Sequence, residues 1–254
     1  MALKQWIGVA LMAALTTAAS IGAESQDAAD SVGEDKEKAL AVLTKADGAA
    51  KAVTAVRFES SVEPTGFMVE FMGAASGHGV MAGWNPELGM PARFYGVATT
   101  DRDGKKAKLE GGGDGETFYI IDHLTRKGYE DIDPEVMGTI GAALRGIGML
   151  EFVHVEPFGD EFGAEMSYLG TELVGDVMCD KVHVVYTGGR GESTWYFSQE
   201  DHLPRRRVRH FDNGGAAGAI DIRVLKLETS PELEGVPFTM RLPDDYEQVD
   251  DFAP

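Results

Sequence analysis

The residues that stand out most for their charge form one basic run, Arg205-Arg206-Arg207-Val208-Arg209-His210. In a β-strand, Arg205, Arg207 and Arg209 would point to one face, because side chains alternate along a strand. A row of guanidinium groups suits an anionic head group or an acidic partner. The more common role of such a row is pairing with acids of the same chain on neighbouring strands. Candidates for that pairing are Glu192, Asp221 and Glu228.

The rest of the sequence has no motif of a catalytic or metal site. The six histidines form no HExxH or HxH spacing, and no GxSxG nucleophile motif occurs. The single cysteine, Cys179, has no disulfide partner and no CxxC motif. It lies in an apolar strand pattern, which is typical of a buried, unreactive thiol. We therefore expect no metal, no cofactor and no enzymatic activity.

Two turn-like segments resemble ligand loops only in part. Asp101-Arg102-Asp103-Gly104 starts like a calcium loop but lacks the remaining ligand positions. Gly111-Gly112-Gly113-Asp114-Gly115 lacks the Lys-Ser/Thr pair and the following helix of a phosphate-binding loop. Both segments therefore predict hairpin loops.

Composition limits the class of partner. The chain has 254 residues and a formal net charge of −19. Such an acidic balance disfavours nucleic acid, whose phosphates require clustered Lys and Arg, and it disfavours anionic membrane surfaces. No Pro/Ser-rich linker divides the chain, so residues 36–254 predict a single domain.

The N-terminus predicts export. Lys4, an apolar stretch and small residues up to Ala23 indicate a secretory signal peptide over residues 1–23. The apolar stretch is too short for a good membrane span. Residues 24–35 are small and acidic and predict a flexible leader, with a helix beginning near Gly33. In a Gram-negative bacterium the mature protein would be periplasmic.

Alternating apolar residues predict most of the elements. Strands are expected at 53–62, 67–72, 92–100, 105–110, 116–122 and 128–132, and again at 165–173, 177–187, 192–198, 205–212 and 219–227. The glycine-rich segment 73–89 predicts a loop. Between the two groups, Asp133-Pro134-Glu135 predicts a helix start. Three glycines within this helix, Val136–Ile147, and Gly148 just after it weaken the helix, so it is expected to move as a lid.

Short motifs follow one another in a characteristic order along the chain. They are Val56-Arg57-Phe58, Asp114-Gly115-Glu116-Thr117-Phe118-Tyr119, Lys127-Gly128-Tyr129, Tyr168-Leu169-Gly170, Cys179-Asp180-Lys181-Val182, Trp195-Tyr196-Phe197, His202-Leu203-Pro204-Arg205, Phe238-Thr239-Met240 and Pro243-Asp244-Asp245-Tyr246. Their order resembles a family of periplasmic bacterial proteins of unknown function. That family belongs to the superfamily of outer-membrane lipoprotein-sorting carriers (LolA-like).

The resemblance implies a mainly β fold with a few helices, in which a half-open antiparallel β-barrel wraps around short helices. The last strand would be Phe238-Thr239-Met240. In the carriers of this superfamily the concave face holds acyl chains. The chain would then be an exported cell-envelope carrier or sensor whose partner is a lipid or a lipoprotein acyl chain.

The expected ligand contacts lie on the strands and on the weak helix. The surplus of Met and Phe suits an adaptable apolar pocket. Expected contacts are Phe58, Val69, Phe71, Phe94, Tyr119, Met137, Ile140, Leu144 and Ile147, with Arg205, Arg207 and Arg209 for an anionic group. The alternative is a non-catalytic interaction or scaffold protein, whose groove is filled by its own side chains and whose acidic exterior docks an envelope partner.

Overall fold

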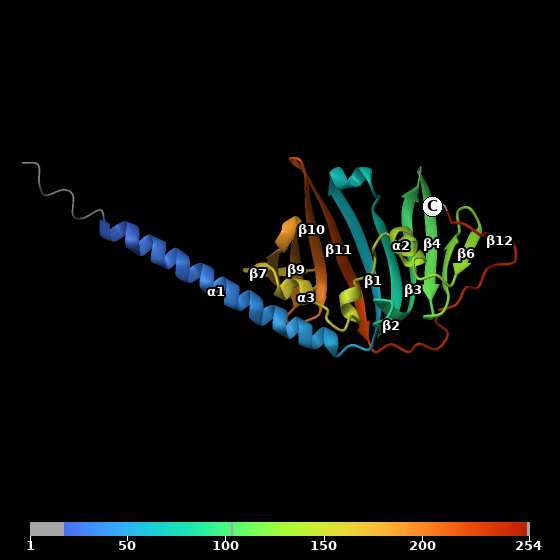
Figure 1. Cartoon of the computed structure of the whole chain (residues 1–254), viewed down its shortest axis with the longest axis horizontal. Helices are drawn as coiled ribbons and strands as arrows, with labels where there is room; N and C mark the ends of the chain where they lie inside the picture. Colours follow the sequence, from blue (N-terminus) through green and yellow to red (C-terminus); the bar gives the residue numbers. More distant parts are fainter. Residues whose placement is uncertain (1–17, 103, 253–254) are drawn as a thin grey trace, which may run out of the picture.

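The computed structural model describes residues 18–102 and 104–252. Most of the predicted signal peptide therefore lies outside the described residues, and the predicted leader and domain boundaries stay predictions. Helix α1 spans Ala18–Lys51, so it begins well before the start expected near Gly33 and includes residues 24–35. Its N-terminal part projects beyond the rest of the molecule (Figure 1).

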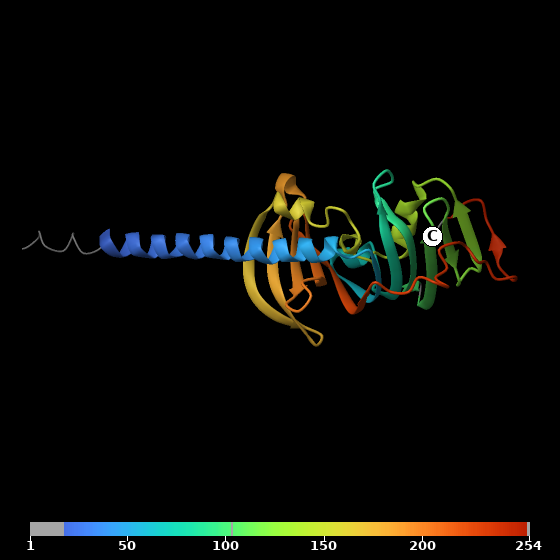
Figure 2. The same ribbon diagram turned by 90° about the horizontal axis from the view of Figure 1, so that it is seen from below.

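One twelve-stranded sheet forms the body of the protein (Figures 1 and 2). The strand order is β12-β6-β5-β4-β3-β2-β1-β11-β10-β9-β8-β7. Neighbours are antiparallel except β12, which runs parallel to β6. The sheet curves without closing, which confirms the mainly β, half-open fold. The strands are β1 Ala55–Gly66, β2 Ala75–Asn85, β3 Met90–Arg102, β4 Lys105–Gly113, β5 Phe118–Asp122, β6 Lys127–Asp131, β7 Glu165–Val174, β8 Val177–Val185, β9 Glu192–Ser198, β10 Pro204–Asn213, β11 Ala216–Thr229 and β12 Glu247–Gln248.

The helices lie on one face of this sheet, called here the inner face, which carries Phe58 and Trp195. Between β6 and β7 the chain forms α2 (Val136–Ala143), the 3-10 helix η2 (Leu150–Phe152) and α3 (Gly159–Phe162). The last turns of α1 pack against β7 and β8. Side chains of α1, α2 and the sheet join in one buried core that includes Leu43, Ile140 and Trp195.

The chain departs from its sequence pattern at four places. β1 continues through Pro64 to Gly66, and the next residues form the 3-10 helix η1 (Phe67–Glu70) instead of a returning strand. The predicted loop 73–89 contains β2, and Gly111–Gly113 belong to β4 instead of a hairpin loop. Segment 238–240 is not a strand. Ladder hydrogen bonds to β1, β3 and β5 override the poor strand propensity of glycine in β2 and β4.

Candidate ligand-binding cleft

A row of glycines crosses the inner face beneath α2. Gly79 pairs with Gly96, and Gly96 pairs with Gly111, on the neighbouring strands β2, β3 and β4. A Cβ atom at Gly111 would lie 3.0 Å from Cγ2 of Ile140, and one at Gly96 would lie 3.0 Å from Cδ1 of Leu144. The missing side chains therefore leave the space in which α2 and the turn after it dock.

The turn after α2 is held by a buried polar contact. Ser60 of β1 is 1 % exposed, and its hydroxyl donates a hydrogen bond of 2.5 Å to the carbonyl oxygen of Ile147. The Ile147 side chain reaches towards Gly77, where a Cβ atom would lie only 2.7 Å from its Cδ1 atom. A buried hydroxyl needs such a partner, so this bond fixes where the segment lies on the sheet.

An open cleft of about 610 Å³ lies between α2 and strands β1–β3. This volume is within the usual range for small-molecule sites. Its walls are mainly apolar, and the carboxyl group of Glu135 is the only acid among them. The apolar side chains that line it are Phe58, Met81, Leu88, Met90, Pro91, Phe94, Pro134, Met137, Ile140, Leu144, Ile147 and Leu150.

The structure brings together six of the nine predicted apolar contacts in this cleft, namely Phe58, Phe94, Met137, Ile140, Leu144 and Ile147. Tyr119 is not among them, because Ile120 next to it faces the inner side and strand side chains alternate. The Tyr119 hydroxyl instead donates a 2.6 Å hydrogen bond to the carbonyl of Pro237.

Val69 and Phe71 also lie outside this cleft. Val69 belongs to η1 and is 58 % exposed, and Phe71, which follows η1, is 66 % exposed. Their expected inward direction depended on a returning strand, which the chain does not form. Phe71 instead lines a second, smaller cleft of about 390 Å³ on the other side of α2.

Sequence reasoning missed the contribution of β2 and of the turn after it. Met81 pairs with Phe94 across β2 and β3, and Leu88 and Met90 close the neighbouring end of the cleft. The alternation of Gly77, Gly79 and Met81 on one face was the available signal. Glycine at two of these three positions concealed it, because a strand pattern is recognised by its large apolar residues.

The arginine run is divided by a β-bulge. The register with β9 shifts between Pro204 and Arg206, so Arg205 does not share a cleft with Arg207 and Arg209. Arg205 pairs with Asp201. Arg207 lies 3.1 Å from Glu151, and its guanidinium stacks 4.4 Å from the Trp195 ring. These partners differ from the expected cross-strand acids.

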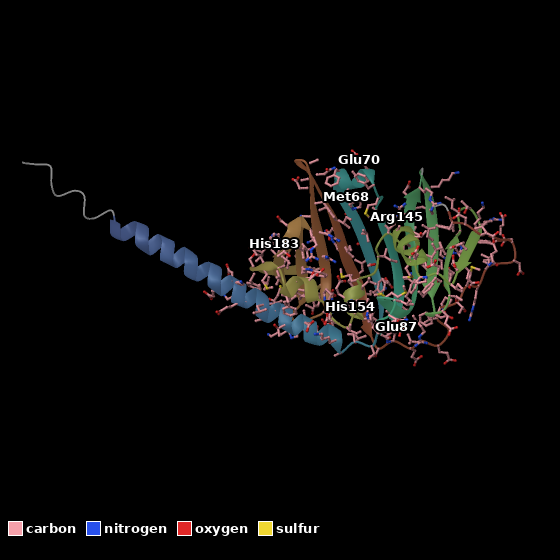
Figure 3. The ribbon with its side chains drawn as sticks, viewed as in Figure 1. Met68, Glu70, Glu87, Arg145, His154 and His183 are labelled. Carbon is pink, nitrogen blue, oxygen red and sulfur yellow. The ribbon has the colours of Figure 1, made fainter. Side chains whose placement is uncertain are left out.

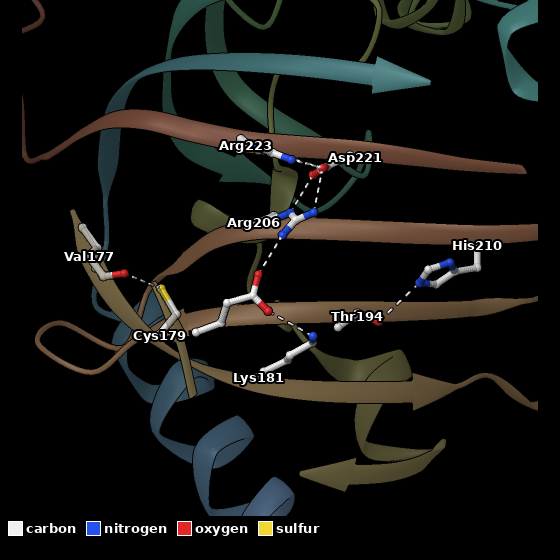
Figure 4. Close-up of polar contacts among 9 residues, drawn as sticks. Val177, Cys179, Lys181, Thr194, Arg206, His210, Asp221 and Arg223 are labelled. Atoms are coloured by element: carbon white, nitrogen blue, oxygen red, sulfur yellow. Dashed lines mark hydrogen bonds and ion pairs between the residues drawn. The ribbon is translucent and has the colours of Figure 1, made fainter. Parts of the chain in front are cut away.

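On the opposite face, Arg206 does meet one expected acid. Its Nε and Nη2 atoms donate bonds of 2.9 Å to the two carboxylate oxygens of Asp221, which Arg223 also contacts (Figure 4). Burial would raise the pKa of Asp221, but the hydrogen bonds from Arg206 and Arg223 outweigh it and hold the pKa below its usual value. This cluster ties β10 to β11.

Helix α3 carries a buried carboxyl group. Glu161 is 4 % exposed and accepts a 2.5 Å hydrogen bond from the hydroxyl of Tyr186. Burial raises the pKa of Glu161, while the bond from Tyr186 and the charge of Arg207 act in the opposite direction. Both residues line a polar cleft of about 630 Å³ with Glu151. No hydrolytic arrangement of Ser, His and Asp is found among the residues that line this cleft.

Cys179 is fully buried, and burial raises the pKa of its thiol to about 11. The thiol therefore stays protonated at neutral pH and is a poor nucleophile. In the described part of the chain, no group of three or more His, Cys, Asp or Glu side chains could hold a metal ion. None of the described helices is both long and apolar enough to cross a membrane.

Comparisons with known proteins give structural similarity without sequence similarity. No family model matches the chain, and no curated protein matches it. Solved structures similar to it include an uncharacterized conserved protein from Thermus thermophilus (12 % identity, TM-score 0.47, 84 % of this chain and 99 % of that one) and the Mycobacterium tuberculosis lipoprotein LppX (15 %, 0.46, 77 % and 97 %). A LolA superfamily protein from Nitrosomonas europaea is also similar (9 % identity, TM-score 0.35, 80 % of this chain and 97 % of that one). Sequence identities and TM-scores this low transfer no ligand and no activity to this chain.

Proposed function

We propose that this protein is an exported cell-envelope protein that binds an apolar ligand, a lipid or an acyl chain, in the cleft between α2 and the sheet. The observation that supports the proposal is the open, mainly apolar cleft of about 610 Å³ beside the glycine row. Burial of an acyl chain there would remove apolar surface of both partners from water. A self-filled groove, which the scaffold alternative requires, would leave no such cleft.

The test uses a variant that fills the cleft without disturbing the helix. Gly141 of α2 lines the cleft, and no atom lies within 4 Å of a Cβ atom built there. Gly141→Leu therefore adds a side chain to open space and improves helix propensity by about 1 kcal/mol. Gly48 of α1 is also exposed and also free of neighbours within 4 Å, so Gly48→Leu is the matched control.

Binding is measured with the uncharged fluorescent probe N-phenyl-1-naphthylamine, and bound lipid is measured by native mass spectrometry of protein purified without detergent. We expect the wild-type protein and Gly48→Leu to bind the probe alike, and Gly141→Leu to bind it about tenfold more weakly or not at all. Probe binding that Gly141→Leu leaves unchanged would contradict the proposed site. Failure of the wild-type protein to bind either probe or lipid would contradict the function.

A further inference from the structure

The second cleft, of about 390 Å³, combines apolar walls with arginine. Phe71 and Met72 border it on one side, and Phe211, Ile220 and Ile222 of β10 and β11 form its floor. The C-terminal end of α2 separates it from the larger cleft. Gly141 and Gly146 line both clefts and carry no side chain, so the partition between the clefts is thin at this end.

Three guanidinium groups surround this second cleft, those of Arg145, Arg207 and Arg209. Arg207 is balanced by Glu151. Among the described residues Arg209 forms no ion pair, and its guanidinium lies 5.3 Å from the ring of Phe211. Arg145 forms no ion pair there either, and its Nε atom is buried without a hydrogen-bond partner. Two positive groups thus face the cleft uncompensated in a chain of net charge −19.

An unsatisfied buried donor costs free energy, so Arg145 requires an explanation. Its backbone adds a second cost. Arg145 has a φ of 54°, in the left-handed region that favours glycine, and the next residue, Gly146, has a φ of 64°. A non-glycine residue in this conformation costs free energy, and a function of the Arg145 side chain would account for that cost. In Figure 3 Arg145 lies beside α2, towards η1 with its labelled Met68 and Glu70.

We propose that Arg145 and Arg209 bind the anionic head group of an acyl-chain amphiphile, a carboxylate or a phosphate, in the second cleft. This inference rests on the proposed function, because the acyl chain would pass over Gly141 and Gly146 into the larger apolar cleft. The head group would accept hydrogen bonds from the guanidinium groups of Arg145 and Arg209. Arg207 is already paired with Glu151, so we assign it no hydrogen bond to the head group.

The experiment compares ligands that share a twelve-carbon chain and differ in the head group: laurate, dodecyl phosphate and uncharged dodecanol. Binding is measured directly by calorimetry, below the micelle concentration of the two anions and below the solubility limit of dodecanol, independently of the fluorescent probe. The wild-type protein is expected to bind at least one of the two anions about tenfold more tightly than dodecanol, because hydrogen bonds to charged groups contribute about this factor. Which anion binds more tightly distinguishes a carboxylate from a phosphate head group.

Two variants remove the proposed contacts. Arg209→Gln and Arg145→Gly are each expected to weaken binding of the preferred anion about tenfold and to leave dodecanol unchanged. Arg145→Gly also removes the backbone strain, so its thermal midpoint should equal or exceed that of the wild-type protein. A variant that is stable but has lost anion preference separates a binding role from a structural one.

Matched controls exist elsewhere in the chain. Arg126 is an exposed arginine outside both clefts, and its φ of 57° matches that of Arg145, so Arg126→Gly reproduces the backbone change and the charge loss. Arg57→Gln is the control for Arg209→Gln, because it removes the charge of another arginine by the same substitution. Equal binding of anions and dodecanol by the wild-type protein, or equal effects of variants and controls, would overturn the head-group site. The proposed function would survive that result if dodecanol and the uncharged probe still bind.

Discussion

The two halves of the sheet fill their inner face in different ways. At β9 large side chains fill the inner face: Trp195 and Phe197 stack at 5.8 Å between centroids, and Phe158, just before α3, contacts both edge-on at 5.5 and 5.3 Å. All three are at most 1 % exposed. At β2–β4 the sheet presents the glycine row instead, and a short helix covers it. Aromatic side chains that fill their own space leave a closed core, whereas a helix resting on glycines leaves a cleft along its flank.

The largest expected loss of stability comes from removing a large aromatic side chain from the closed core at β9. Trp195→Ala removes the largest fully buried side chain among the described residues and should lower the free energy of unfolding by about 3–5 kcal/mol. Phe94→Ala, at the wall of the open cleft, should cost clearly less, because the space it leaves joins a cleft that already exists. Urea denaturation measures both. Equal losses for the two variants would contradict the difference between the halves.

Trp195→Phe sharpens the same comparison. Trp195 Nε1 is buried without a hydrogen-bond partner, so phenylalanine keeps an aromatic ring and removes an unsatisfied donor. Its loss of stability should therefore be much smaller than that of Trp195→Ala, again measured by urea denaturation.

The next largest effect comes from adding a side chain to the glycine row. Gly111→Ala places a methyl group 3.0 Å from Ile140 Cγ2 and 3.4 Å from the Tyr119 carbonyl oxygen. The resulting overpacking should lower the free energy of unfolding by about 1–3 kcal/mol and shift α2 away from the sheet. Denaturation gives the energy, and hydrogen exchange of the α2 amides reports the shift. Unchanged exchange and stability would show that α2 does not depend on the row.

A smaller change, this time a gain in stability, is expected from a substitution on the cleft side of α2. Gly141→Ala meets no atom within 4 Å, so it should stabilise the protein by about 0.5–1 kcal/mol through helix propensity and reduced chain entropy. A rise in the thermal midpoint measures it. A destabilising result would mean that this face of α2 is already covered.

The smallest expected effect is a change in pH dependence in the closed half. Burial raises the pKa of Glu161 above its ordinary value of 4.5, although Tyr186 and Arg207 oppose the shift. The stability contributed by this group is therefore fully present below the unfolded-state pKa and is lost as pH rises through the folded-state pKa. Glu161→Gln should flatten this decline, as urea denaturation across a pH series would show. Asp160→Asn, at an exposed neighbour paired with Arg190, should leave the decline intact.

Regular alternation of apolar and polar residues made much of the sheet predictable. The five closing strands were expected close to their observed bounds, because Val182, Trp195 and Val224 stand among apolar residues with period two. The start of the helix after Asp133-Pro134 was expected for a similarly local reason, its N-terminal signal, but the helix ends at Ala143 and not at the expected Ile147. Where glycine replaced the large apolar residues, as in β2 and in Gly111–Gly113 of β4, the same reasoning failed.

The sequence by itself determined the mainly β character of the fold and six of the apolar residues that line the cleft, because strand alternation and helix starts are properties of neighbouring residues. The export signal stays a prediction. The tertiary structure alone decided that Gly79, Gly96 and Gly111 form one row, that α2 rests on it and that Tyr119 faces away. It also decided that Arg145, 60 residues before Arg205, joins Arg209 at one cleft while Arg205 does not. Such neighbourhoods follow from pairing and packing between distant segments, which sequence spacing does not encode.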